Sequence, residues 1–115
     1  MISGQKVYLA ALERDDLEQL RNWRNQEDFR KNFREYREIN KDMQTRWYEN
    51  RVLNDEHTIM FGIHDRNDDS LIGCCGLCYI NFVNRNADIS LYIGKDNAYI
   101  DDQGYAEESL KLLSQ

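Results

Sequence analysis

One stretch near the C-terminal end of the chain decides the fold: DISLYIGKDNAYIDDQGYAEESLKLL, residues 88–113. The pattern predicts a strand that runs as far as Gly94, then a polar loop, then a helix that Gly104 opens. A helix N-terminus presents unpaired N–H groups and a partial positive charge, so this one is a candidate phosphate site. A glycine there lets the backbone approach a phosphate closely. Taken alone the signal is weak, since most such glycines only make a turn.

Upstream of this stretch, the sequence predicts strands joined by short polar turns. Runs of alternating or apolar residues at 58–64, 71–82 and 87–93 are separated by clusters of Asp, Asn and Arg. This spacing is typical of an antiparallel meander. A further strand is expected at 6–10. We expect that first strand to pair antiparallel with the second, with helices on both sides of the sheet.

Helical spacing marks the region between the first and second strands. Asp15 and Glu18 have the spacing of a capping box, which predicts a helix start there. A second short helix is expected over 26–33, and a third is expected from an Asn40 cap to a break at 54–56. The order is strand, helices, three-stranded meander, loop and helix. It defines an α+β (mixed α/β) domain.

The composition limits the classes of function. The chain has 115 residues, 41% of them hydrophobic and 31% charged, which fits one globular domain. Its formal net charge is -6, and general nucleic-acid binding needs a basic surface instead. The acidity suits a cationic or amine substrate, and solubility alone also accounts for it. No leader-like start or membrane-spanning apolar run is present, so a cytoplasmic location is expected.

Three clustered cysteines, Cys74, Cys75 and Cys78, do not form a metal-site pattern. On a strand Cys74 and Cys75 point to opposite faces, and Cys74 and Cys78 lie about 13 Å apart. They cannot share one tetrahedral zinc ion, so no metal site is expected. Small buried hydrophobic side chains are the favoured interpretation. A covalent acetyl-cysteine is a weaker alternative, because His57 and His64 have no evident pairing with a cysteine.

The whole chain resembles the GNAT superfamily of acetyl-CoA-dependent N-acetyltransferases. The resemblance is strongest to the branch of ribosomal-protein N-terminal, spermidine and aminosugar N-acetyltransferases. No single motif decides it, but the motifs follow one another in a specific order. They are VYL at 7–9, DL at 16–17, LRNWRN at 20–25, QTRWY at 44–48, LIGCCGL at 71–77, IN at 80–81, NRNAD at 84–88 and GYAEE at 104–108.

The resemblance implies a reaction and a set of site residues. An unprotonated primary amine would attack the thioester of acetyl-CoA directly. The amine could belong to an aminosugar, a polyamine, another small molecule or a protein N-terminus. The implied cofactor contacts are backbone groups in two places. They are Tyr92 and Ile93 for the pantetheine arm, and Gln103, Gly104, Tyr105 and Ala106 for the pyrophosphate.

On the acceptor side, the resemblance implies roles for three further side chains. Asp88 would be the carboxylate that faces the substrate amine, with an exposed strand residue as the alternative. Trp23 and Arg24 would line the acceptor pocket. A tryptophan at the position of Trp23 is more often a core residue, and Arg24 could bind an anionic group such as a nucleotide-sugar phosphate.

Two departures from the family pattern qualify these expectations. Asp101 stands where the family carries Gln or Arg, and carboxylates repel a pyrophosphate unless they point away. The family fold also continues with a strand, a helix and a closing hairpin, which normally supply the tyrosine that protonates the thiolate. We therefore expect residues 1–115 to be a single truncated GNAT domain. The alternative is a catalytically inactive module that binds coenzyme A weakly or associates with other chains, including a second copy, through its unfinished sheet edge. We also expect the final helix to promote self-association, because Leu110, Leu112 and Leu113 include side chains with no evident partner.

Overall fold

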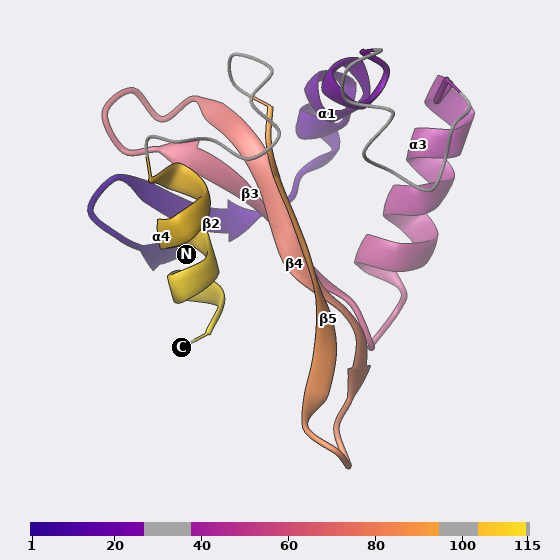
Figure 1. Ribbon diagram of the computed structural model, residues 1–115. Helices are drawn as coiled ribbons and strands as arrows, with labels where there is room; N and C mark the ends of the chain where they lie inside the picture. Colours follow the sequence, from indigo (N-terminus) through magenta and orange to yellow (C-terminus); the bar gives the residue numbers. More distant parts are fainter. Residues whose placement is uncertain (27–37, 95–103, 115) are drawn as a thin grey trace.

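The sheet is an antiparallel meander, as the sequence predicts. The computed structural model describes residues 1–26, 38–94 and 104–114. Five strands lie in the order β1-β2-β3-β4-β5, each antiparallel to its neighbour (Figure 1). Their bounds are β1 Ile2–Ser3, β2 Val7–Ala11, β3 Ile59–Asp65, β4 Leu71–Asn81 and β5 Asn86–Ile93. In the described ranges, the two-residue strand β1 is the one addition to the four strands expected.

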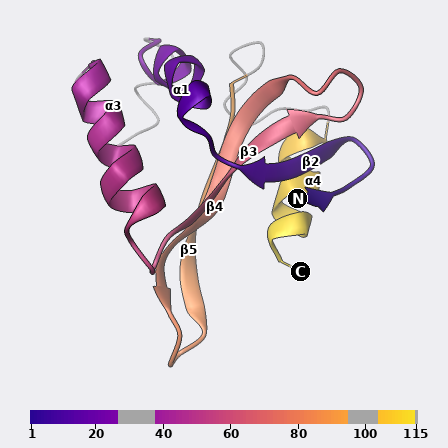
Figure 2. The same ribbon diagram turned by 180° about the vertical axis from the view of Figure 1, so that it is seen from behind.

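Helices cover both faces of the sheet, which confirms the expected arrangement. Helix α1 (Leu17–Arg24) and helix α3 (Lys41–Trp47) lie on one side, and α4 (Tyr105–Leu113) lies on the other (Figures 1 and 2). A 3-10 turn, η1 (Arg14–Asp16), precedes α1, and a π-helical segment, η2 (Tyr48–Leu53), continues α3. The short helix expected over 26–33 lies outside the described residues beyond Gln26.

The predicted N-terminal cap is right for α3 and wrong for α1. The side chain of Asn40 accepts a hydrogen bond from the Met43 N–H at 2.8 Å, so the expected cap of α3 is confirmed. The expected cap at Asp15 with Glu18 is wrong. The helix begins two residues earlier with the 3-10 turn, where the Asp16 carboxylate accepts from the Glu13 N–H at 2.9 Å.

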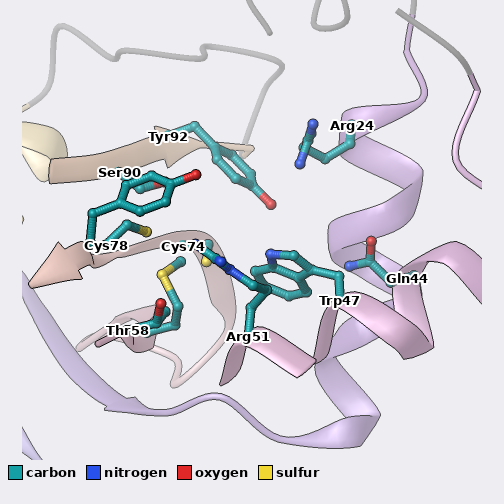
Figure 3. Close-up of a pocket in the computed structure, with 11 residues that line it drawn as sticks. Arg24, Gln44, Trp47, Arg51, Thr58, Cys74, Cys78, Ser90 and Tyr92 are labelled. Carbon is teal, nitrogen blue, oxygen red and sulfur yellow. The ribbon is translucent and has the colours of Figure 1, made fainter. Parts of the chain in front are cut away.

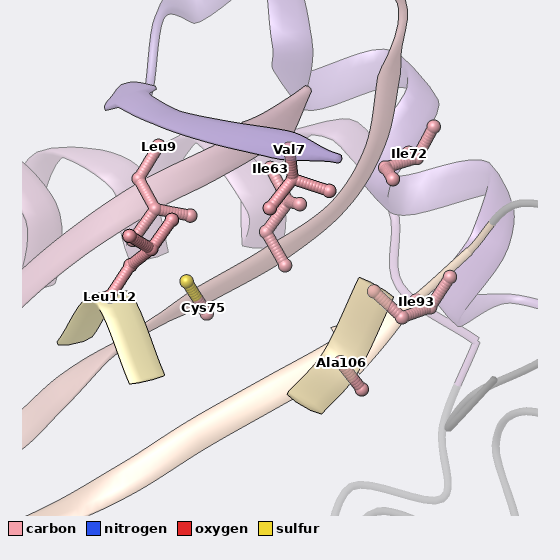
Figure 4. Packing of buried hydrophobic residues seen from close by; sticks show 8 residues of the cluster. All are labelled: Val7, Leu9, Ile63, Ile72, Cys75, Ile93, Ala106 and Leu112. Carbon is pink, nitrogen blue, oxygen red and sulfur yellow. The ribbon is translucent and has the colours of Figure 1, made fainter. Parts of the chain in front are cut away.

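The final helix packs on the sheet, contrary to the expectation that its leucines would lack partners. Leu112 is 5% exposed and contacts a buried cluster with β-strand residues (Figure 4). Leu113 packs at the edge of that cluster, and Leu110 is 39% exposed. Helix α4 contacts β2, β4 and β5. The cluster comprises Val7, Leu9, Ile63, Ile72, Cys75, Ile93, Ala106 and Leu112.

A second buried cluster lies on the opposite face, beneath α1 and α3. It comprises Leu12, Leu20, Trp23, Tyr48, Cys74 and Tyr92. The alternation of β4 sends Cys74 into this cluster and Cys75 into the α4-side cluster, as the sequence predicts. The two faces of β4 and β5 therefore support two different layers, and the candidate site lies on the α1 and α3 side.

Candidate functional site

A pocket of about 430 Å³ opens between the sheet and the helices α1 and α3 (Figure 3). The helical wall is formed by Arg24 at the end of α1 and by Gln44, Trp47 and Arg51 on α3 and η2. Residues 44, 47 and 51 are spaced three and four apart, so they share one helix face. This wall combines two guanidinium groups, one amide and one indole.

The sheet forms the floor of the pocket. Ser90 and Tyr92 line it from β5, and Cys74 and Cys78 line it from β4. These side chains share a face because residues two apart on a strand point the same way. Burial raises the pKa of the Tyr92 hydroxyl well above its usual value, and the charge of Arg24 offsets this only in part. Tyr92 is therefore a neutral hydrogen-bond donor at physiological pH.

The three cysteines of β4 are poor nucleophiles. Burial raises the pKa of the Cys74 thiol and of the Cys78 thiol, and it raises that of Cys75 to about 12. A thiol is a nucleophile only as its thiolate, so all three are inert at neutral pH. The nearest polar partners of the histidine rings are backbone carbonyls, with His57 Nδ1 2.8 Å from the oxygen of Ile80. Among the described residues no group of side chains could hold a metal ion.

The structure brings Arg24 into this pocket but places Trp23 and Asp88 outside its lining. Trp23 is 8% exposed and belongs to the cluster beneath α1, with its indole packed against Gly94. Asp88 is exposed on β5 and pairs with Cys78 across the ladder. Because it lies two residues from Ser90, it is on the pocket-facing side of the strand, beyond the pocket itself.

The outer edge of β5 offers backbone groups for an extended ligand. The N–H of Gly94 donates to the oxygen of Ile72 at 2.7 Å, which makes this a hydrogen-bonded pair. Hydrogen-bonded pairs alternate along an antiparallel ladder, so Tyr92 is also turned inward to β4 while Ile93 faces the open edge. In the described part of the chain no strand pairs with that edge. The alternation of hydrogen-bonded pairs therefore points the backbone N–H and C=O of Ile93, and not those of Tyr92, toward the open edge.

Helix α4 begins without a side-chain cap. Gly104 is the N-cap residue in the left-handed region, with φ 93°, and no side chain caps the helix. Tyr105 and Ala106 begin the helix, and the Ala106 side chain is buried in the α4-side cluster. The fourth predicted pyrophosphate residue, Gln103, lies outside the described residues. The amine of Lys6 lies close to Gly104.

A carboxylate fixes this helix to the sheet. Oε1 of Glu108 accepts hydrogen bonds from the N–H groups of Lys6 at 2.8 Å and Val7 at 3.0 Å. Both donors belong to the start of β2 or the residue before it. The first turn of α4 is therefore held in a defined position relative to the sheet.

The amino-acid sequence matches a known family over nearly the whole chain. Residues 6–115 match the family described as Acetyltransferase (GNAT) domain. The chain belongs to the GNAT acetyltransferase family. Enzymes of this family use acetyl-CoA.

Solved structures place this GNAT chain beside the spermidine N-acetyltransferases. The enzyme from Vibrio cholerae, solved in complex with CoA and spermine, has a TM-score of 0.78 and 25% identity. The match covers 93% of this chain and 60% of that one. A domain from Methanocaldococcus jannaschii shares the GNAT-like fold, with a TM-score of 0.75, 17% identity, and coverage of 96% of this chain and 69% of that one. No curated protein matches significantly.

The chain spans about 60% of the length of the spermidine N-acetyltransferase structure just described. No helix in the described ranges is both long and apolar enough to cross a bilayer. Gln44, Arg51 and Tyr79 are among the pocket residues of this GNAT domain that sequence reasoning missed. Gln44 and Arg51 share the helix face of Trp47, a spacing that was visible in the sequence. Tyr79 lines the pocket from an irregular point in β4, where it adopts a positive φ of 53°.

Proposed function

We propose that this chain is an N-acetyltransferase that transfers the acetyl group of acetyl-CoA to a primary amine bound in the pocket beneath α1 and α3. One observation carries the proposal. On β5, Tyr92 lines the pocket while the next residue, Ile93, turns its backbone to the open edge of the sheet. One strand therefore carries a wall of the acceptor pocket and, at the next residue, backbone groups on the open edge where the cofactor would bind.

The cofactor would lie along this edge and end at α4. The outward N–H and C=O of Ile93 would pair with the amides of the pantetheine arm, as an added strand does. The N–H groups of Gln103, Gly104, Tyr105 and Ala106 would bind the pyrophosphate at the positive end of the helix. Lys6, whose amine lies close to Gly104, adds a positive charge beside that position.

In the reaction, the amine nitrogen forms a bond to the thioester carbonyl carbon, and the carbon–sulfur bond breaks. The amine must lose a proton, and we assign the carboxylate of Asp88 as its acceptor through solvent. Asp88 is exposed on the pocket-facing side of β5, which supports this role. Tyr92 would act as cofactor wall and donor, since its hydroxyl stays neutral. We also propose a cytoplasmic location. The three cysteines support it, because they are free thiols and cytosolic proteins rarely contain disulfides.

The test is acetyl transfer by the 115-residue chain. Acetyl-CoA is incubated with a panel of primary amines, free thiol is followed continuously, and acetylated product is identified by mass spectrometry. The proposal expects amine-dependent thiol release with a matching product. Measurable coenzyme A binding without turnover on any amine would contradict it and favour a non-catalytic module that binds the cofactor.

A further inference from the structure

We propose that Tyr79 selects the acceptor of the pocket beneath α1 and α3, and that it favours a primary amine joined to an aromatic ring. The inference rests on the proposed acetyl transfer, because it names a specificity residue and an acceptor class for the same pocket. It is drawn from an irregularity in β4 that turns the Tyr79 side chain, and from the other side chains that line the pocket.

Tyr79 reaches the pocket because the pairing of β4 with β5 is interrupted beside it. The regular ladder ends at the pair of Cys78 with Asp88, and two residues of β4 then lie opposite Ala87 alone, as in a β-bulge. Strict alternation would place residue 79 on the α4 side of the sheet with Cys75, because residues two apart on a strand point the same way. The structure instead has Tyr79 in the pocket lining.

The backbone at this position is unfavourable for a tyrosine. Its φ of 53° lies in the left-handed region, which favours glycine and tolerates asparagine. Residues held in such conformations cluster at ligand sites, and bulges that re-aim a side chain are frequent beside active sites. A role in the pocket therefore explains a tyrosine here better than the stability of the strand does.

The ring of Tyr79 is held in place and still has open surface. The guanidinium carbon of Arg51 lies 5.0 Å from the ring centroid, and Arg51 pairs with Asp55 at 3.4 Å. Tyr79 is nonetheless 66% exposed. The contact with Arg51 orients the ring, and the exposed part of the ring offers apolar surface to a ligand.

The other lining residues suit an aromatic group. Trp47 from α3 and Tyr92 from β5 point toward the same space (Figure 3). Met60 and Cys78 add sulfur atoms to the lining, and thioether sulfur contacts rings favourably. The volume of about 430 Å³ is within the usual range for a site that binds a small organic molecule.

The charges of the lining disfavour a polyamine. Arg24 and Arg51 line the pocket, and its described lining residues include no carboxylate. A polyamine brings further ammonium groups besides the one that reacts, and like charges repel strongly away from bulk water. The proposed class of acceptor therefore has one amine and an uncharged body.

The positions of the rings fit the two ends of such an acceptor. The reacting amine has to reach β5, from which Ser90 and Tyr92 line the pocket. Tyr79 and Trp47 belong to β4 and α3, so their rings are placed for the rest of the acceptor. An aromatic ring in contact with these two, joined to the amine by a short alkyl chain, satisfies both conditions.

The experiment compares acceptors that differ in the group joined to the amine. Acetylation kcat/KM is measured for 2-phenylethylamine, 2-cyclohexylethylamine, n-butylamine and spermidine. The phenyl and cyclohexyl compounds have nearly the same size, so they isolate the contribution of the aromatic ring. We expect phenylethylamine to exceed n-butylamine and spermidine by about tenfold or more, and cyclohexylethylamine by about threefold.

Variants connect that preference to Tyr79. Tyr79→Asn removes the ring, tolerates the positive φ, and should reduce the preference over n-butylamine to about threefold or less. Tyr79→Phe keeps the ring and should keep the preference. Phe82→Asn should leave it intact, because Phe82 is an exposed aromatic residue in the turn after β4, outside the pocket lining. Urea unfolding checks that Tyr79→Asn is folded, and Tyr79→Gly provides a second test if it is not.

The outcomes separate this inference from the proposed function. Phenylethylamine acetylated no more efficiently than any one of the other three amines, or a preference kept in full by Tyr79→Asn, would overturn the inference and leave acetyl transfer standing. If no amine is acetylated, the proposed function fails, and tryptophan fluorescence titration with the same amines decides the inference. Tighter binding of phenylethylamine, lost in Tyr79→Asn and kept in Phe82→Asn, would support it. Equal binding of the four amines, or no binding, would refute it.

Discussion

At the scale of single residues, the most specific proposal about the cofactor is that Gly104 lies against its pyrophosphate. Its φ of 93° is strained for a β-branched residue, at a cost of roughly 1–2 kcal/mol. Gly104→Val should also hinder close approach of a phosphate. We expect coenzyme A affinity to fall about tenfold, which corresponds to about 1.4 kcal/mol. Gly104→Asn is the control, since asparagine tolerates the left-handed region and should retain more affinity. Calorimetry giving the valine variant an unchanged affinity would remove the site assignment.

Gly94 tests the packing of the predicted pocket residue Trp23. A Cβ on Gly94 would overlap the indole ring, so Gly94→Ala should overpack the site and destabilise the chain by about 1–3 kcal/mol. Urea unfolding measures the loss. In a Trp23→Leu background the cost should shrink, because the overlapping ring is gone. An identical cost in both backgrounds would show that the indole does not pack there.

Single residues also show where sequence reasoning stops. Trp23 and Trp47 attract attention because they are large and rare, and the resemblance singled out Trp23 and Arg24. Gln44 and Arg51 lie on one helix face with Trp47, but polar residues at that spacing equally mark a solvated face. Only tertiary packing decides which face meets the sheet. The positive φ at position 79 likewise could not be predicted, because the residue there is a tyrosine and not a glycine or asparagine.

At the scale of elements, the attachment of α4 to β2 is the contact on which the cofactor site depends. Glu108→Ala would leave the N–H groups of Lys6 and Val7 without their carboxylate partner. We expect a loss of about 1–3 kcal/mol in the free energy of unfolding and weaker coenzyme A binding. Glu107→Ala is the matched control, because Glu107 lies in the same turn, is exposed, and pairs with Lys111 on its own helix. Equal losses in the two variants would argue against the anchoring role.

The elements themselves were largely predictable. The period-two alternation and the polar turns placed the strands of the meander to within a residue, since a shift would move apolar side chains to the wrong face. The cap of α1 was misplaced because several acidic residues near Asp15 can cap, and because a 3-10 turn precedes the helix. The packing of α4 was misjudged because a sequence shows that Leu112 is apolar but does not show which strand it meets.

At the scale of the whole molecule, self-association stays a prediction with one of its two reasons removed. Leu112 is buried within the chain, so the α4 leucines no longer require a second copy. The outer edge of β5 is still unpaired among the described residues, and such edges pair readily with another strand. We expect sedimentation to show a concentration-dependent dimer. A monomer at all concentrations would contradict pairing through this edge.

The most direct test of the account is a titration of the isotopically labelled chain with coenzyme A, followed by backbone amide NMR. The account predicts saturable shift changes at the amides of Ile93, Gly104, Tyr105 and Ala106. The amides of the η1 turn, which leads into α1 on the other side of the sheet from α4, should stay unchanged. The absence of changes at those four amides under saturating coenzyme A, or changes confined to other elements, would contradict the claim that β5 and α4 form the cofactor site of this GNAT domain.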